Sequence, residues 1–459
     1  MSAQLFPALL EQAAGRHGSA IALREKQGGL WRQWSWAEMA RAVSARAGAL
    51  AARGLGPGDV LAVIGDGRAD WLITERAALS LGVAVLALAG DLDPAIAAGR
   101  LQRSGARAAL ACDMAALELL VGLAGDRPAL LIDASGPTPK PEAAAAGIVH
   151  VDALGAGTAP AGRIGPDDPA LLDAADGDIT VITHGRLASL AEGSPLQPGD
   201  DLMSALAPAY LAERIAVGYW PLTCGATVSF AENRETVGDD LIELRPTVVV
   251  GPPRLWKRLA LAITLASEDA TPFQRWMLAR ALGDGAMPLR GWLKGRLRAR
   301  IGLDRARLLV NLGAPLGPGL AGWYRTIGRP VTDAKALAPM GLPAEAALRD
   351  SLLIHDALLV GPGTAILAAE AEPVARFVRR AGVEAVTDQS AFDTPAVHAL
   401  ILDEVRRINA GLPPDQRLTE LRLLRESISL DHPLVGPDAL IARSLADQVQ
   451  ADDVAILKA

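Results

Sequence analysis

Helical and strand spacings of apolar residues alternate along the N-terminal part of the chain. Apolar residues recur three and four positions apart where helices are predicted, and short runs of small or branched apolar residues predict buried strands. Strands separated by helices are typical of a parallel sheet that is covered on both faces. The predicted helices are 6–14, 34–53, 71–81 and 93–104, and the predicted strands are 60–64, 83–87, 108–111 and 129–133.

The pattern changes after residue 133. Residues 133–168 are rich in Pro, Gly, Ala and Thr, a composition typical of a surface linker. Further strands are predicted at 247–251, 308–312 and 358–360, and a helix at 397–409. We therefore expect an α/β protein with one doubly wound lobe in 1–165, a second in 166–340, and a third region in 341–459.

Composition narrows the class of protein. Half of the 459 residues are apolar, enough for large cores, and the longest mostly apolar run, 77–89, is too short to span a bilayer. The N-terminus has no secretion-signal pattern, so we expect a cytoplasmic protein. The net charge of −7 argues against general nucleic-acid binding. Neither the two cysteines nor the six histidines have the spacing of a metal site, and no disulfide framework is indicated.

Residues 206–258 carry a distinctive block, which includes GYWPL at 218–222, CGA at 224–226 and PRLW at 253–256. This block resembles the acyl-side core of long-chain acyl-CoA synthetases, AMP-forming ligases of the adenylate-forming superfamily. The helix–turn–strand–helix pattern of 34–84 resembles the N-terminal part of the same family. The resemblance extends over residues 5–339 and, less closely, 397–430, and it implies two lobes followed by a reduced C-terminal α+β remnant.

The resemblance implies acyl-binding positions in the second lobe. Trp256 stands at the position that resembles the gate of a fatty-acid tunnel, and Tyr210 stands where the family commonly has His. The alternative is that these side chains belong only to the core. The acyl-binding candidates are Tyr210, Gly218, Tyr219, Trp220 and Trp256.

The phosphate loop of the family, YTSGTTG-x-PKG, corresponds to the turn 173–178, which reads DAADGD and lies between strand 168–172 and Thr183-His184. Phosphates need backbone amides, a lysine and hydroxyl groups around them. The turn has no Lys, Ser or Thr, and its three carboxylates repel phosphate unless a metal ion lies between them. A metal site and a solvated turn are the two interpretations of this acidic cluster.

The other catalytic motifs of the family are also altered. Gly313, Ala314 and Pro315 match part of the Gly-Gly-Ala-Pro-Leu segment and are vestigial nucleotide-binding positions. The YG-x-TE motif falls on 335–339 (KALAP), without chemical equivalents, and the family's final lysine falls on Leu440. The ribose-binding Asp is not found within 341–394. We therefore assign no catalytic residue and no metal ligand.

These observations favour a non-catalytic pseudoenzyme that binds an acyl chain or a partner protein and needs no cofactor. One alternative is an active fatty-acid–CoA ligase with diverged motifs, which requires ATP, Mg²⁺ and CoA. Another is a scaffold partner of an active synthetase or a lipid-transport system. Residues 290–307 form a basic amphipathic segment that fits a peripheral membrane contact, a partner protein, or a solvated helix over the core.

Overall fold

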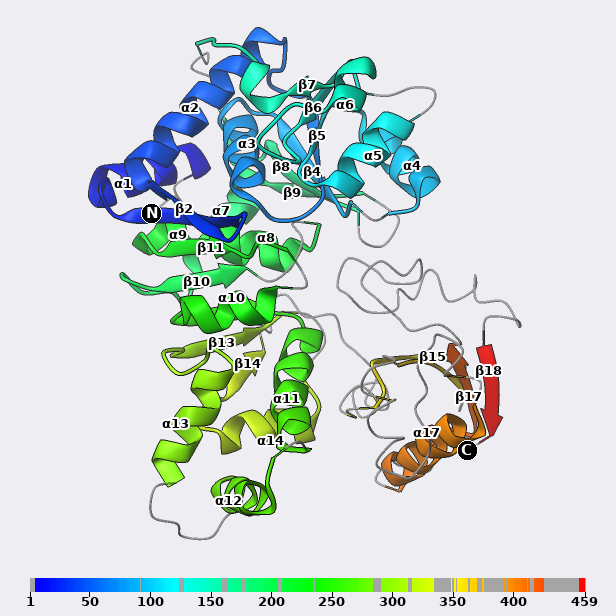
Figure 1. The fold of residues 1–459 in the computed structure, drawn as a ribbon. Helices are drawn as coiled ribbons and strands as arrows, with labels where there is room; N and C mark the ends of the chain where they lie inside the picture. Colours follow the sequence, from blue (N-terminus) through cyan, green and yellow to red (C-terminus); the bar gives the residue numbers. More distant parts are fainter. Residues whose placement is uncertain are drawn as a thin grey trace. The chain divides into compact units, whose positions relative to one another are not determined.

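The computed structural model divides the chain into two compact units, unit 1 (Met1–Val250 with Arg305–Arg307) and unit 2 (Gly251–Asp304 with Leu308–Ala459). Figure 1 shows both units as ribbons. The structure describes residues 5–458 except 91, 124–127, 159–163, 175–178, 205–208, 234–235, 269, 284–289, 313–315, 334–347, 349–350, 352, 362–363, 370–373, 375–391, 393, 411, 413–416 and 425–453.

Unit 1 contains a seven-stranded sheet in the order β7-β6-β5-β3-β4-β8-β9. Its neighbouring strands are parallel except for β8 and β9. Since β4 and β5 lie on opposite sides of β3, the sheet is doubly wound, as the sequence predicts. The strands are β3 (Val60–Ile64), β4 (Ala84–Leu88), β5 (Ala106–Ala111), β6 (Leu130–Asp133), β7 (Val149–His150), β8 (Pro169–Asp173) and β9 (Thr180–Thr183).

Helices lead into and connect the parallel strands of this sheet. The bounds of α2, α3 and α4 agree with the predicted ones to within two residues, whereas α5 was not predicted. Ser35 ends strand β2 and accepts a hydrogen bond from the N–H of Glu38, so the helix begins at Trp36 and not at Trp34. The helices are α2 (Trp36–Ala52), α3 (Ala69–Ser80), α4 (Pro94–Ser104) and α5 (Met114–Gly122).

A second group of strands in unit 1 was only partly predicted. β10 pairs in parallel with both β11 and β12, and β11 pairs in parallel with β1. β1 and β2 form an antiparallel hairpin that the sequence analysis missed. Its turn uses Gly28 and Gly29, both at positive φ. The strands are β1 (Ile21–Gln27), β2 (Leu30–Ser35), β10 (Asp201–Ser204), β11 (Thr227–Phe230) and β12 (Val248–Gly251), and the accompanying helices are α1 (Phe6–His17), α7 (His184–Glu192), α8 (Leu211–Gly218), α9 (Trp220–Cys224) and α10 (Val237–Leu244).

The segment 133–168 is not simply a surface linker. It contains α6 (Pro141–Ala145) and β7, which extends the first sheet because the apolar side chains of Ile148 and Val151 are buried there. Further along, the main chain at Gly157 lies against Gly48 of α2. A Cβ atom added to Gly48 would lie 1.9 Å from the carbonyl oxygen of Gly157, so this contact requires glycine on α2.

Unit 2 begins with helices and two parallel strands. The predicted basic helix of 290–307 ends earlier, at Arg300, because the chain turns at Gly302 (φ 71°) and then buries Leu303. The elements are α11 (Pro253–Glu268), α12 (Pro272–Leu282), α13 (Arg290–Arg300), β13 (Leu308–Asn311), α14 (Pro318–Thr326) and β14 (Val331–Asp333), with β13 parallel to β14.

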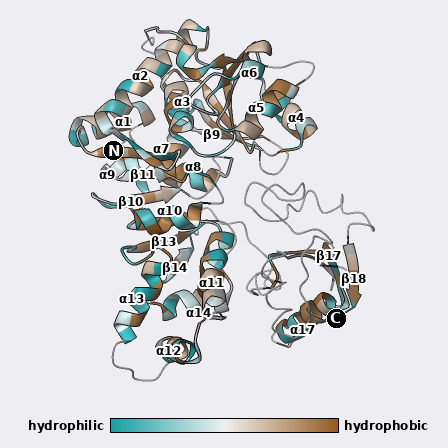
Figure 2. Cartoon of the chain, viewed as in Figure 1, coloured by the Kyte–Doolittle hydropathy of each residue, from teal (hydrophilic) through white to brown (hydrophobic). Residues whose placement is uncertain are grey.

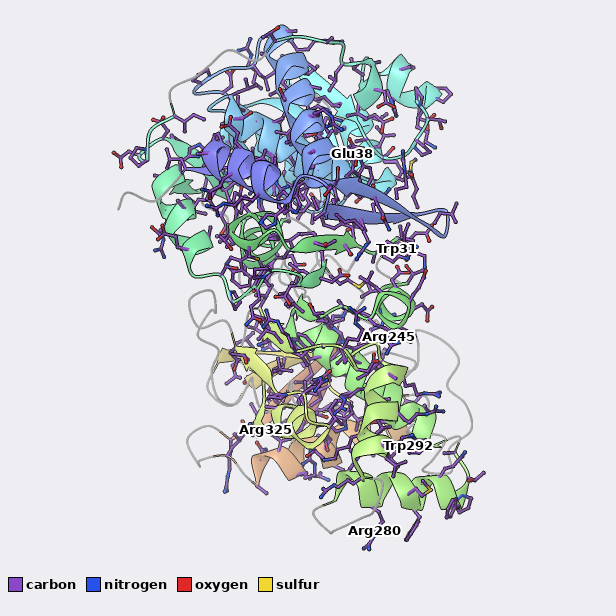
Figure 3. All side chains as sticks on the ribbon, turned by 90° about the vertical axis from the view of Figure 1, so that its left-hand side faces the viewer. Trp31, Glu38, Arg245, Arg280, Trp292 and Arg325 are labelled. Carbon is purple, nitrogen blue, oxygen red and sulfur yellow. The ribbon has the colours of Figure 1, made fainter. Side chains whose placement is uncertain are left out.

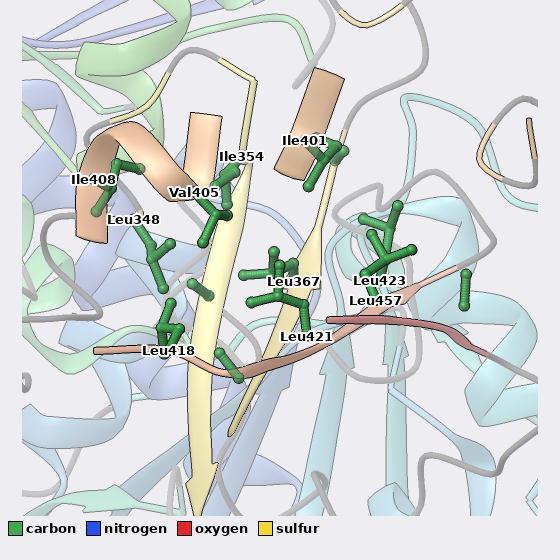
Figure 4. Close-up of a cluster of buried hydrophobic side chains, with 14 of the residues drawn as sticks. Leu348, Ile354, Leu367, Ile401, Val405, Ile408, Leu418, Leu421, Leu423 and Leu457 are labelled. Atoms are coloured by element: carbon green, nitrogen blue, oxygen red, sulfur yellow. The ribbon is translucent and has the colours of Figure 1, made fainter. Parts of the chain in front are cut away.

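The C-terminal part of unit 2 has its own sheet and core. The sheet runs β15-β16-β17-β18, with β16 and β17 parallel and the outer pairs antiparallel. Figure 4 shows the apolar side chains of α17 and of these strands gathered in one cluster, which includes Ile401, Val405, Leu367 and Leu421. The elements are β15 (Asp356–Gly361), β16 (Thr364–Ala368), α17 (Pro395–Asn409), β17 (Glu420–Leu424) and β18 (Val454–Lys458).

The apolar run at 77–89 is divided between α3 and β4. No helix in the described ranges is both long and apolar enough to cross a bilayer. The predicted α/β class is therefore confirmed. The predicted boundaries after residues 165 and 340 stay predictions.

Candidate functional site

The turn that corresponds to the phosphate loop lies at the tip of the β8–β9 hairpin. Asp173 and Thr180 are the last paired residues of the hairpin, so the connecting segment is 174–179. Ala174 and Ile179, at its two ends, pack into the core of the first sheet. Residues 175–178, with two of the three carboxylates of the turn, lie outside the described residues.

The carboxylate of Asp173 interacts electrostatically with the guanidinium of Arg100 in α4. Burial lowers the pKa of Arg100, the neighbouring Arg103 lowers it further, and the Asp173 carboxylate opposes both. The hairpin therefore presents a carboxylate toward Arg100. This arrangement leaves less positive potential for an added anion than a lysine in the turn would give.

His184 begins helix α7 directly after the hairpin. The side chain of Thr183 accepts a hydrogen bond from the N–H of Arg186 and caps the helix, and the N–H of His184 donates to the carbonyl of Asp168 across 3.0 Å. The His184 side chain is 1 % exposed, and neither ring nitrogen has a hydrogen-bond partner among the described residues. Burial lowers its pKa, with Asp168 opposing, so the imidazole is neutral at pH 7.

A second candidate position lies at the carboxyl ends of β13 and β14, where ligands bind in open α/β sheets. The amide of Asn311, the last residue of β13, donates to Oδ1 of Asp333, the last residue of β14, across 2.7 Å. The N–H of Leu316 points to the same oxygen at 3.5 Å. The vestigial positions Gly313, Ala314 and Pro315 lie between these residues in the chain but outside the described residues, as does 335–339.

Three of the acyl-binding candidates lie together where α8 meets α9. The hydroxyl of Tyr219 donates to Oε1 of Glu75 in α3 across 2.8 Å, and its ring packs edge-on against Phe6. The carbonyl of Gly218 accepts from Arg76 at 2.8 Å. The indole N–H of Trp220 donates to the carbonyl of Leu190 at 3.2 Å. These groups therefore join α3 and α7 to the α8–α9 region.

Glu75 is the centre of this buried network. Its Oε2 accepts from Nε of Arg214 at 2.7 Å and from the indole of Trp71 at 3.1 Å. Arg214 also donates to the carbonyl of Val85 at 2.8 Å. Burial lowers the pKa of Arg76 to about 10, with Tyr219 and Glu75 opposing, so this guanidinium keeps its charge at pH 7.

This network was not predicted from the sequence, although a signal for it was present. An adjacent Glu-Arg pair interrupts the apolar helix α3 at 75–76 and again the apolar helix α8 at 213–214. Charged residues are rarely buried unless they are paired. Two Glu-Arg pairs in two apolar helices therefore indicate that the charged residues of one helix contact those of the other.

The remaining two acyl-binding candidates lie elsewhere. Tyr210 immediately precedes α8, at the opposite end of that helix from Tyr219. Trp256, in α11 of unit 2, is fully buried, and its indole donates to the carbonyl of Gly251 at 3.1 Å. The ring of Tyr324 packs edge-on against it at 5.7 Å, and the Tyr324 hydroxyl donates to the carbonyl of Trp256 at 2.7 Å.

Comparison with solved structures shows the fold. The adenylation domain of a carboxylate reductase from Mycobacterium chelonae superposes with a TM-score of 0.72 at 15 % identity, covering 98 % of this chain and 90 % of that one. The corresponding domain from Segniliparus rugosus, solved with AMP and a co-purified carboxylic acid, gives a TM-score of 0.75 at 14 % identity, covering 98 % and 93 %.

Curated relatives match over shorter segments. The chain is 27 % identical to long chain acyl-CoA synthetase 1 of Arabidopsis thaliana over 195 residues, 36 % of this chain and 29 % of that protein. It is 25 % identical to long-chain-fatty-acid–CoA ligase ACSBG2 of Gallus gallus over 174 residues, 34 % of this chain and 22 % of that protein. The matches thus span less than a third of each relative.

The family comparison covers more of the chain. The sequence model of the family described as "AMP-binding enzyme" matches residues 10–173 and 180–337. The interruption between the two segments falls at the tip of the β8–β9 hairpin. These two segments make up more than half of the sequence. The chain therefore belongs to the AMP-binding enzyme family.

Proposed function

We propose that this protein is a non-adenylating member of its family that binds an acyl ligand. The observation that carries the proposal is the β8–β9 hairpin. It closes across Asp173 and Thr180 and leaves only AADGDI to connect the strands. That connection has no lysine and no hydroxyl side chain with which to hold phosphates.

Electrostatics at the hairpin oppose nucleotide binding. By sequence, the turn carries three acidic residues, Asp173, Asp176 and Asp178, where the family's loop would hold the phosphates of ATP. Two like charges about 4 Å apart repel by several kcal/mol at the effective dielectric of a protein surface. Each preorganised donor that an adenylating site loses removes about 3–4 kcal/mol of transition-state stabilisation. The residues present therefore fit neither ATP nor its departing pyrophosphate, and no cofactor is assigned.

The acyl ligand is proposed because residues 206–258 resemble the acyl side of the long-chain synthetases. The two curated relatives act on long-chain acyl substrates by their names. Tyr210 and Trp256 remain the proposed contacts within this block. The hydrogen bonds of Gly218, Tyr219 and Trp220 favour a structural role for those three residues.

Titration calorimetry of the full chain with magnesium-ATP, with and without a long-chain fatty acid, tests both halves of the proposal. We expect no heat from nucleotide at millimolar concentration and a saturable signal from fatty acid. The Trp256→Phe variant should change the fatty-acid affinity, whereas Trp34→Phe, at a half-buried tryptophan of β2 in unit 1, should leave it unchanged. Tight magnesium-dependent nucleotide binding would refute the proposal.

One observation favours an active ligase as the second candidate. The Asn311–Asp333 pair places an amide and a carboxylate at the carboxyl ends of two parallel strands, and the vestigial positions 313–315 follow Asn311 in the sequence. A ligase would require ATP, Mg²⁺ and CoA. Release of pyrophosphate with fatty acid present would support it. If neither nucleotide nor fatty acid binds, the scaffold function remains, with a synthetase or lipid-transport protein as the partner.

A further inference from the structure

Helices α12 and α13 expose their aromatic side chains. No described side chain of either helix is buried, although both contain leucine and aromatic residues. Phe273 is 65 % exposed, Trp276 56 % and Trp292 58 %. Large aromatic side chains normally supply much of the buried area of a core, so three exposed ones on adjacent helices indicate an interaction surface.

Each exposed aromatic ring packs against another ring or a guanidinium group. Phe273 and Trp276 lie one turn apart on α12, with ring centroids 6.0 Å apart and planes within 22° of parallel. On α13 the guanidinium of Arg296 lies over the ring of Trp292 at 5.5 Å. Aromatic rings combined with cations suit the boundary between lipid headgroups and acyl chains.

The same surface is strongly basic within an acidic chain. Residues 271–303 contain seven lysines and arginines and one acidic residue, while the whole chain carries −7. Figure 2 shows hydrophilic colour along α13, and Figure 3 shows Arg280 pointing away from the ribbon at the end of α12. Four arginines of α12 and α13 are exposed: Arg275, Arg280, Arg296 and Arg300. Within the described part of the chain, none of the four has a carboxylate partner.

A groove of about 670 Å³ lies between α11, α12 and α13. Its lining is mainly apolar, with Ile263, Met277 and Leu297 among the side chains, and Arg296 and Arg300 complete it. A hydrocarbon segment below an anionic headgroup matches this combination of apolar lining and cations.

We propose that the surface formed by α12 and α13 binds an anionic lipid bilayer. The rings of Phe273, Trp276 and Trp292 insert at the headgroup boundary, and the arginines bind headgroup phosphates. A second copy of the chain is disfavoured as the occupant, because a symmetric contact would place two basic surfaces against each other. The proposal does not depend on acyl binding or on the loss of adenylation.

Flotation of the full chain with vesicles tests the proposal. We expect binding to phosphatidylcholine vesicles that contain phosphatidylglycerol, little binding to phosphatidylcholine alone, and release in high salt. Each arginine near an anionic surface strengthens partition about fivefold. The double variant Arg275→Gln with Arg280→Gln should therefore bind about 25-fold more weakly at low salt.

The aromatic contribution is tested by Phe273→Ser with Trp276→Ser. The matched control is Leu30→Ser, since Leu30 of β2 is 74 % exposed and belongs to unit 1. We expect the double variant to lose vesicle binding and the control to retain it. The thermal unfolding curves of both should equal that of the unaltered protein. Equal binding to both vesicle types would overturn the proposal, and so would unchanged binding in both double variants. It would also be overturned if the protein bound no vesicles and formed a dimer that Trp276→Ser dissociates.

Discussion

The Nε atom of Arg214 donates to Oε2 of Glu75 across 2.7 Å, although 139 positions separate the two residues in the chain. Both side chains are buried, at 1 % exposure. The pair thus links α3, beside the first sheet, to α8, beside the second group of strands. Desolvation makes such a pair costly to form, and the loss of one partner is more costly still.

We predict that Glu75→Gln lowers the free energy of unfolding by about 3–5 kcal/mol, because it leaves the buried guanidinium of Arg214 without a counter-charge. Urea unfolding followed by circular dichroism measures the loss. Asp403→Asn is the control, because the Asp403–Arg406 pair on α17 is exposed and should contribute less than about 1 kcal/mol.

A double-mutant cycle separates the pair from its surroundings. Glu75→Gln combined with Arg214→Met should cost clearly less than the sum of the two single changes, since the charge that each single change leaves unpaired is then absent. Additive losses would show that the two side chains are not energetically coupled.

We predict that Gly48→Ala destabilises unit 1 by about 2 kcal/mol or more, because the new methyl group meets the main chain of Gly157. Gly15→Ala is the matched control, since Gly15 also lies inside a helix but has no atom within 4 Å of its added Cβ. That change should stabilise the protein by up to about 1 kcal/mol through helix propensity alone. Thermal unfolding compares the two, and equal effects would contradict the close contact of α2.

The pH dependence of stability should report His184. Its pKa in the folded state is lowered by burial, so the unfolded chain binds more protons between the folded pKa and the ordinary value near 6.5. Stability contributed by the neutral ring is therefore complete above about pH 6.5 and falls as the pH is lowered. We expect His184→Leu to remove up to about 1.4 kcal/mol per pH unit of this slope in urea titrations between pH 5 and 7. An identical slope in the variant would show that His184 does not titrate differently on folding.

Trp256 should be a large contributor to the stability of unit 2. We predict that Trp256→Ala costs about 3–5 kcal/mol, since the ring is fully enclosed and packs on Tyr324. Trp292→Ala removes an exposed ring and should stay within about 0.5 kcal/mol. Urea unfolding of both variants makes the comparison. A small effect at Trp256 would contradict the close packing of its ring in unit 2.

The alternation of helices and strands in unit 1 was predictable because each strand is a short apolar run and each helix ends at a clear signal. Val60–Ile64 was predicted with its observed bounds. The β1–β2 hairpin was missed because Arg24, Glu25, Lys26, Arg32 and Gln33 interrupt its apolar pattern. Strand β7 was missed because a two-residue strand inside a Pro- and Gly-rich segment has no period to detect.

The candidate site was predictable only as far as local sequence determines it. The carboxylates of the β8–β9 turn can be seen in the sequence, but the Glu75–Arg214 pair and the Asn311–Asp333 pair join residues far apart in the chain. The exposure of Phe273 and Trp276 could not be predicted either, because the sequence pattern of an apolar helix face is the same whether or not another element covers it.

The Glu75–Arg214 bond also sets a condition on synthesis. A ribosome completes α3 and all the strands of the first sheet, through β9, before it reaches α8. Until then Glu75 lies on an apolar helix without the guanidinium that neutralises it, and Tyr219 has not yet been made. The hydrogen-bond network around Glu75 is therefore completed only after residues 214–219 have emerged.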